Sequence, residues 1–169
     1  MASVASVEGV AEKVRARLAR ARASEAKLET REQLRDVATA TADEHKTLIF
    51  TTLSLDARQL MLVFARQWFG SLRAAAAHAL VIGHGAATCR SLLDLAVPCY
   101  ADRLAPKLRG RQNEFGPQVL LKWWYALALV QDGFRIVFSD VDVAFLADPL
   151  AAWRAMPGGD DVHGLSDIY

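Results

Sequence analysis

The stretch Phe134-Arg-Ile-Val-Phe-Ser-Asp140-Val-Asp142 decides which fold this 169-residue chain is predicted to adopt. Its apolar first half predicts a strand that is buried on both faces, interrupted only by Arg135 and closed by Ser139. Two carboxylates follow, where the strand should end, and open α/β sheets bind ligands at that end. Because desolvated carboxylates need a cation or hydrogen-bond donors, Asp140 and Asp142 predict a bound partner, and oxygen ligands suit Mg²⁺ or Mn²⁺.

The upstream residues alternate between short apolar runs and helical patterns. Strands are predicted over residues 48–54, 79–83 and 97–100, and helices over 60–68 and 86–95. Strands that alternate with helices at this spacing predict an α/β fold, with a mostly parallel sheet and helices on both faces. The length fits one domain with a sizeable core.

A further helix is predicted between Gly116-Pro117 and Gly133, since proline suits the first helical position and glycine a helix end. Residues 118–131 are apolar on nearly all sides, so we expect this helix to be buried, with Trp123-Trp-Tyr125 in the core. Lys122 is its only charge. A lysine in a buried helix has to reach solvent, pair with a carboxylate or face an anionic ligand.

The residues after the carboxylate pair predict one more helix and one more strand. Asp148-Pro149 is a helix-start signature, with Asp148 as the cap, so this carboxylate has a sufficient structural role. A strand is predicted over 161–166. For Asp140 and Asp142 the alternative to a metal site is a structural role in loop turns.

Residues 1–41 are rich in Ala, Arg and Glu and contain no proline. Apolar residues at three- and four-residue steps predict a charged helix, and Thr30 with Gln33 predicts a capping box that starts a second one. Charged residues interrupt a coiled-coil seam, so we expect a solvated helical lead-in over 1–41 and the domain over 42–169. An Arg- and Ala-rich start also fits a transit peptide, although its glutamates argue against one.

Composition excludes some classes of protein. Twenty basic and nineteen acidic residues leave a formal charge of +1, so no global field favours nucleic acid as a partner. No run reaches the ~18 apolar residues of a transmembrane helix, and no secretory signal is recognisable. Cys89 and Cys99 lack metal-type spacing, which leaves buried thiols or, in an oxidising compartment, a disulfide.

The chain resembles the nucleotide-diphospho-sugar transferases of glycosyltransferase family 77, the plant and algal xylosyl- and arabinosyltransferases. The resemblance runs roughly from Leu34 to the C-terminus. It rests on the strand at 48–54, the Cys89…Cys99-Tyr100 region, Lys122, the string from Gly133 to Asp142, and Asp148-Pro149-Leu150. It implies a GT-A fold, which is a Rossmann-type sheet, and transfer of a pentose or hexose from a UDP-sugar to a glycan or glycoprotein acceptor.

The resemblance also implies roles for particular residues. Asp142 is expected to bind Mn²⁺ (or Mg²⁺) directly, and Asp140 to bind the metal or the ribose. Lys122 is expected to meet a phosphate of the donor as a point charge. Thr51 and Thr52, at the end of the first predicted strand, are expected to contact the nucleoside.

The chain departs from the family after the motif, because only 27 residues follow Asp142. Such enzymes place the acceptor site and often a histidine ligand further downstream, and His163 is expected to be an ordinary strand residue. We therefore expect a domain truncated at its C-terminal side, whose activity as a short chain is open. The family implies the Golgi lumen, whereas the lack of a recognisable signal or anchor leaves a cytoplasmic location as the alternative.

Three other interpretations of Asp140-Val-Asp142-Val were compared. In haloacid-dehalogenase phosphatases the first aspartate is a nucleophile and the second an acid/base, but that motif opens the first strand of the chain. An EF-hand loop fails because Ala144 and Phe145 occupy positions that need an oxygen ligand and glycine. A non-catalytic remnant that keeps a nucleotide pocket or an interaction surface stays an alternative.

Overall fold

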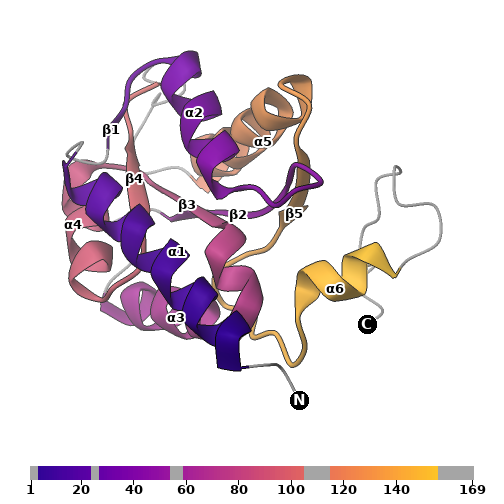
Figure 1. The fold of residues 1–169 in the computed structure, drawn as a ribbon. Helices are drawn as coiled ribbons and strands as arrows, with labels where there is room; N and C mark the ends of the chain where they lie inside the picture. Colours follow the sequence, from indigo (N-terminus) through magenta and orange to yellow (C-terminus); the bar gives the residue numbers. More distant parts are fainter. Residues whose placement is uncertain (1–3, 24–26, 54–58, 105–114, 156–169) are drawn as a thin grey trace, which may run out of the picture.

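The computed structural model describes residues 4–23, 27–53, 59–104 and 115–155. They form an α/β fold with a five-stranded, all-parallel sheet in the order β1-β4-β3-β2-β5 and helices on both faces (Figure 1). The strands are β1 (Lys27–Leu28), β2 (Thr47–Leu53), β3 (Ala79–Gly83), β4 (Cys99–Asp102) and β5 (Arg135–Phe138). The helices are α1 (Val4–Ala23), α2 (Arg31–Thr41), α3 (Gln59–Ser71), the 3₁₀ helix η1 (Arg73–His78), α4 (Ala86–Asp94), α5 (Phe115–Gln131) and α6 (Pro149–Arg154). The predicted Rossmann-like class is confirmed.

Side chains of the sheet alternate between two apolar clusters, because successive residues of a strand point to opposite faces. On one face, Phe50 and Ile82 pack with α2 and α5. On the other face, Ile49 and Val81 pack with α3, α4 and η1. The central strands β2 and β3 are therefore apolar on both sides, as expected for a covered parallel sheet.

The chain changes direction across the sheet at β2. Strands β3 and β4 lie on one side of β2 and are reached through α3 and α4, whereas β5 lies on the other side and is reached through α5 on the opposite face. The carboxyl ends of β2 and β5 therefore flank a topological switch point, where open α/β sheets bind ligands.

Both helix starts predicted from cap residues are confirmed. The Gln33 N–H donates to Thr30 Oγ1 at 3.2 Å and the Thr30 N–H donates to Gln33 Oε1 at 3.2 Å, which completes a capping box at α2. At α6, Asp148 Oδ1 accepts hydrogen bonds from the N–H groups of Leu150 and Ala151 at 2.9 and 3.2 Å. The carboxylate of Asp148 is thus occupied by the helix.

Two strands differ from the prediction. The strand predicted over 97–100 is found as β4, two residues later, because its pairing with β3 begins at Cys99, opposite Val81. Strand β1 was not predicted, since two residues give no periodic signal and it exists through pairing with β4. The strand predicted over 161–166 lies outside the described residues.

The predicted burial of β5 and α5 is confirmed only in part. Strand β5 is exposed at Arg135 and only half-buried elsewhere, because it is the last strand on its side of the described sheet. Helix α5 buries Tyr125 completely, but Trp123, Leu127 and Val130 are more than half exposed. These three positions share one helix face, so α5 packs on the sheet with one side only. Its apolar composition on nearly all sides gave no sign of which side this is.

The predicted lead-in over 1–41 is helical and packs on the sheet within its described part. Leu34 and Ala38 of α2 are fully buried in the same cluster as Phe50, and β1 is hydrogen-bonded to β4. Most other residues of α2 are exposed. The solvated surface expected of a stalk is therefore found on one side of this helix only.

Cys89 and Cys99 form a disulfide, which was one of the two states left open by the sequence. The bond joins α4 to β4 across a Cα–Cα distance of 5.0 Å, and both residues are buried. Gly83, at the end of β3, lies against it. A Cβ atom on Gly83 would lie 2.7 Å from Cys89 Sγ and 3.0 Å from Cys99 Sγ, so only glycine fits beside the disulfide.

We expect Gly83→Ala to lower the free energy of unfolding by about 1–3 kcal/mol, because the added methyl group overpacks a site that the disulfide holds fixed. Urea denaturation of the oxidised protein measures this. The matched control is Gly70→Ala in α3, where nothing lies within 4 Å of the new Cβ. The control should be neutral or more stable by up to about 1 kcal/mol. Equal midpoints for the two variants would contradict the close contact.

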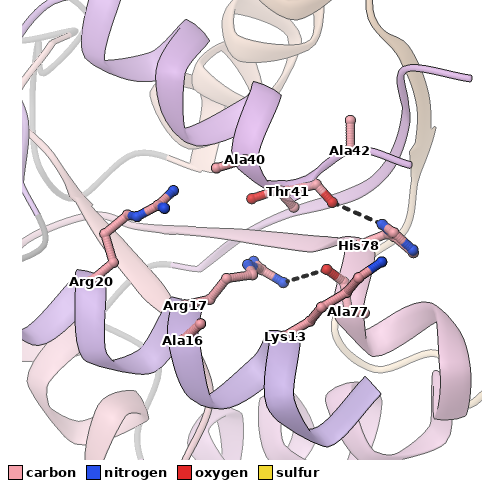
Figure 2. A pocket seen from close by; sticks show the side chains of 9 residues that line it. All are labelled: Lys13, Ala16, Arg17, Arg20, Ala40, Thr41, Ala42, Ala77 and His78. Atoms are coloured by element: carbon pink, nitrogen blue, oxygen red, sulfur yellow. Dashed lines mark hydrogen bonds between the residues drawn. The ribbon is translucent and has the colours of Figure 1, made fainter. Parts of the chain in front are cut away.

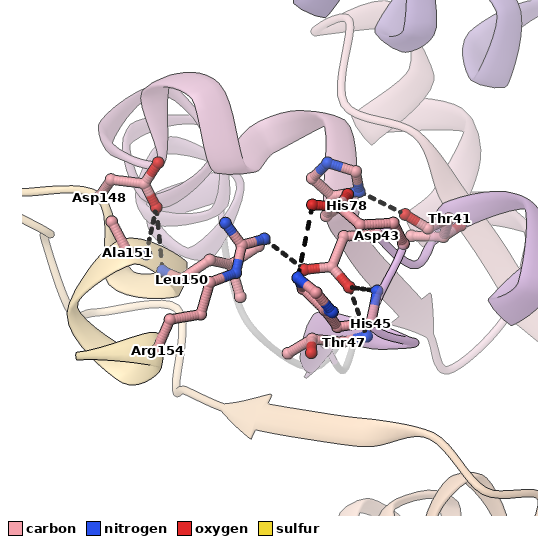
Figure 3. Close-up of polar contacts among 10 residues, drawn as sticks. Thr41, Asp43, His45, Thr47, His78, Asp148, Leu150, Ala151 and Arg154 are labelled. Carbon is pink, nitrogen blue, oxygen red and sulfur yellow. Dashed lines mark hydrogen bonds and ion pairs between the residues drawn. The ribbon is translucent and has the colours of Figure 1, made fainter. Parts of the chain in front are cut away.

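The buried carboxylate of Asp43 joins α6 to the amino end of β2 (Figure 3). Its Oδ2 accepts a hydrogen bond from Arg154, and its Oδ1 accepts from the N–H groups of His45 and Thr47 at 2.9 and 2.8 Å. Burial alone would raise the pKa of Asp43, but these donors and the Arg154 charge outweigh it and hold the pKa below its usual value. Asp43 is therefore an anion at neutral pH.

We expect Arg154→Gln to destabilise the protein by about 1–2 kcal/mol at pH 7. Because the folded-state pKa of Asp43 lies below the unfolded one, the stabilisation is complete above about pH 4 and is lost as the pH falls through the folded-state pKa. Unfolding curves from pH 7 to pH 2 should therefore converge for wild type and variant. Arg90→Gln, at an exposed arginine of α4, is the control and should change little at any pH.

Candidate functional site

The candidate site lies at the carboxyl ends of β2 and β5. The two strands pair from Thr47 with Arg135 to Phe50 with Phe138, and the Ser139 N–H then donates to Phe50 O at 3.2 Å. Strand β2 continues beyond this point while β5 does not. Residues 140–142 therefore emerge beside the last residues of β2, at the switch point of the sheet.

Within this segment the two aspartates are exposed and the residue between them is buried. Val141 is 5% exposed and packs in the cluster shared with α3 and α4, whereas the Asp140 side chain is 62% exposed. Asp142 is exposed as well. Val141 thus anchors the backbone while its two neighbours present carboxylates to solvent.

Helix α3 fixes the backbone around the carboxylates. Trp68 Nε1 donates to Ser139 Oγ at 3.2 Å, and Ser139 Oγ donates to Asp140 O at 2.9 Å. Further along, the Phe145 N–H donates to Ser71 Oγ at 3.1 Å. The loop is therefore held on both sides of the aspartate pair before it enters α6.

Lys122 of α5 reaches the same place. Its Nζ lies 3.4 Å from Asp140 Oδ1 and 4.8 Å from the centroid of the Phe138 ring. Of the three roles that the sequence left open for this lysine, contact with a carboxylate is found. The contact places an ammonium group beside the carboxylate of Asp140.

Thr51 and Thr52 point to opposite faces of β2. Thr51 is fully buried, and its Oγ1 has no hydrogen-bond partner among the described residues. Its hydroxyl reaches a nucleoside only after a rearrangement of the structure. Thr52 is half-buried and points to the face that α5 covers, so it shares a face with Lys122.

The donor set fits an open magnesium or manganese site better than a closed structural one. Among the residues that the structure describes, no three His, Cys, Asp or Glu side chains are grouped as metal ligands. Mg²⁺ commonly uses one or two carboxylates and completes its shell with water and substrate phosphates. Asp140 and Asp142 can supply that number, whereas a structural zinc site needs four protein ligands.

A polar cluster that was not predicted lies at the ends of β3 and β4. Asp102 is fully buried and accepts hydrogen bonds from the Tyr125 hydroxyl and from the Leu104 N–H, the latter at 2.9 Å. Its other carboxylate oxygen lies 3.9 Å from His84 Nδ1. The prediction ended the strand at Tyr100, which assigned Asp102 to a loop. Asp102 directly follows three apolar strand residues, and this pattern could have predicted a carboxylate at the end of the strand.

We expect Tyr125→Phe and Asp102→Asn to couple in a double-mutant cycle, with an interaction energy of about 1–3 kcal/mol. Tyr125→Phe removes a donor from a buried carboxylate, and this loss matters less once Asp102 is neutral. Unfolding free energies of the wild type, both single variants and the double variant measure the coupling. Additive effects would contradict a direct hydrogen bond.

Comparison of the chain with protein-family models, with curated proteins and with solved structures found no match. Within the described ranges, none of the helices combines the length and the apolar character that crossing a membrane requires.

Proposed function

We propose that the chain forms the nucleotide-binding part of a metal-dependent glycosyltransferase that uses a UDP-sugar donor. The observation that carries this proposal is the exposed pair Asp140 and Asp142 at the switch point of a parallel sheet, with Lys122 Nζ 3.4 Å from Asp140 Oδ1. Carboxylates for a divalent cation and an ammonium for a phosphate are the groups that a nucleoside diphosphate needs. The resemblance to glycosyltransferase family 77 and the Rossmann-like strand order support a GT-A fold.

In net sugar transfer an acceptor hydroxyl forms a bond to the anomeric carbon and releases its proton to water, while the bond to the diphosphate breaks and the diphosphate leaves with the bonding electrons. Asp142, together with Asp140 unless Asp140 binds the ribose, would hold Mn²⁺ or Mg²⁺, which would supply positive charge for the leaving diphosphate. Lys122 contributes a second positive charge, aimed at a phosphate oxygen. We assign contact with the nucleoside to Thr52, the more accessible of the two threonines.

The acceptor is proposed to be a glycan or a glycoprotein and the transferred sugar a pentose or hexose, as the resemblance implies. The disulfide between Cys89 and Cys99 supports an oxidising compartment, because such bonds are rare in the cytosol. The Golgi lumen, which the resemblance implies, is consistent with this bond, and the cytoplasmic alternative is less so.

A second candidate function is nucleotide binding without transfer. It is favoured by the small ligand set, since no third His, Cys, Asp or Glu joins the aspartate pair within the described part of the chain. Both candidates predict UDP binding at Asp142, and only the first predicts turnover of a UDP-sugar.

We expect UDP to bind the purified chain only when Mn²⁺ is present, and Asp142→Asn to weaken this binding at least about tenfold. The reason is that Asp142 would hold the cation whose positive charge attracts the diphosphate, so loss of this carboxylate charge would weaken the binding of the cation and of UDP together. Calorimetric titration with Mn²⁺ and with EDTA measures the dependence. Equal UDP binding in EDTA would contradict a metal-bridged site.

Two further variants sharpen this experiment. Lys122→Gln should weaken UDP binding but leave Mn²⁺ binding in the absence of UDP intact, because the lysine contacts the anion and not the metal. Asp36→Asn, at an exposed aspartate of α2, is the matched control and should behave as wild type. Assays with UDP-sugars then separate transfer from binding, and turnover of a phosphate monoester would instead favour a dehalogenase-type phosphatase.

A further inference from the structure

A second candidate site lies at the opposite end of the sheet from the aspartate pair. A pocket of about 180 Å³ opens between α1, the end of η1 and the end of α2 (Figure 2). Its wall includes Thr41, which precedes β2, and His78, which precedes β3. The pocket therefore faces the amino ends of the strands, whereas Asp140 and Asp142 follow the carboxyl end of β5.

The described wall of this pocket is rich in basic side chains. Lys13, Arg17 and Arg20 come from α1 at positions i, i+4 and i+7, which share one helix face, and His78 comes from η1. None of the described residues that line the pocket is acidic. His78 Nδ1 lies 2.9 Å from Thr41 O, and because a carbonyl only accepts, Nδ1 carries a proton.

Arg17 is the buried member of this group, with 4% of its surface exposed. Its Nη1 donates to the carbonyl oxygens of Ala76 and Ala77 at 3.2 and 3.1 Å, and its Nη2 donates to Ala79 O. Burial lowers the pKa of Arg17 to about 10, which still leaves the guanidinium charged at neutral pH. Its partners are neutral carbonyls, so the described residues supply hydrogen bonds but no counter-ion.

The third nitrogen of the Arg17 guanidinium group is Nε. The Nε atom is buried and has no hydrogen-bond partner among the residues that the structure describes. A buried donor without an acceptor destabilises the folded state, and a buried charge without a counter-ion destabilises it further. An anion in the pocket would remove both costs.

We propose that this pocket binds a phosphate-class oxyanion, either free phosphate or the phosphate group of a small monoester. Its oxygens would accept from Arg17 Nε and from the Lys13 ammonium, with the charge of Arg20 close by. About 180 Å³ is several times the ~30 Å³ that one water occupies in the liquid, so a tetrahedral anion and some water fit. The bound anion joins α1 to the amino ends of β2 and β3 and does not depend on the aspartate pair.

The test is an NMR titration of the ¹⁵N-labelled full chain with inorganic phosphate at pH 7.5, with ionic strength held constant by sodium chloride and no divalent metal. We expect saturable shifts of the Arg17 Nε–H signal and of the Thr41 and His78 amides. The melting temperature should rise with phosphate concentration, as required for a ligand of the folded state. Shifts that do not saturate, or that chloride reproduces, would overturn the proposal.

The variants change the exposed residues Lys13 and Arg20 and leave Arg17 in place. Arg17 is not replaced because it anchors α1, and its loss would destabilise the fold. Lys13→Gln combined with Arg20→Gln should weaken phosphate binding at least about tenfold. Arg15→Gln is the matched control, since Arg15 is exposed on the same helix and does not line the pocket. Equal affinity of wild type and the double variant would overturn the proposal.

Two further titrations identify the source of the anion and test whether the pocket is independent of the nucleotide site. Glycerol phosphate that binds more tightly than inorganic phosphate supports a monoester, and equal or weaker binding supports free phosphate. Asp142→Asn should keep phosphate binding unchanged, because the site is at the other end of the sheet. Phosphate binding that Asp142→Asn abolishes would overturn the assignment to this pocket.

Discussion

The unequal pairing of β2 with its two neighbours is the constraint from which the candidate site follows. Pairing with β3 uses Ile49 to Leu53, whereas pairing with β5 uses Thr47 to Phe50. Strand β5 therefore ends three residues before β2 does. The segment after β5 continues beside the end of β2 that β5 leaves unpaired, and it carries Asp140 and Asp142 there.

Position alone does not make this segment a site, because a loop at the end of a strand can carry carboxylates into solvent. Val141 packs in the core, and the Trp68 indole binds Ser139, so the backbone between the two aspartates is fixed by the same helix that covers the sheet. Lys122 then arrives from the other face. The two carboxylates lie on the segment after β5, which α3 holds in place, and the ammonium comes from α5, so rigid elements support all three groups.

The sequence predicted the elements whose signal is local and missed the features that depend on distant contacts. The strand at 79–83 and the capping box at Thr30 depend on neighbouring residues, and both are found as predicted. Strand β1 exists only because β4 is available to pair with it. The exposure of Trp123 could not be predicted, because a helix that is apolar on nearly all sides does not reveal which side packs.

The same distinction applies to the functional residues. Asp140, Asp142 and Lys122 stood out because charge in an apolar context is visible in a sequence. His84 and Asp102 approach each other only through the pairing of β3 with β4. The burial of Arg17 runs against the usual exposure of arginine, and only the packing of α1 on η1 reveals it.

The two ends of the sheet differ in charge for a physical reason. In a parallel α/β fold, helices begin near the carboxyl ends of the strands and end near the amino ends, so helix dipoles favour anions at the first and cations at the second. The hydrogen bonds of Arg17 to Ala76 and Ala77 are of this kind, since they satisfy carbonyls at the end of η1. The same reason accounts for His78 Nδ1 at Thr41 O. It does not account for Arg17 Nε, which has no hydrogen-bond partner among the described residues. This unpartnered donor distinguishes the proposed anion site from a set of helix caps.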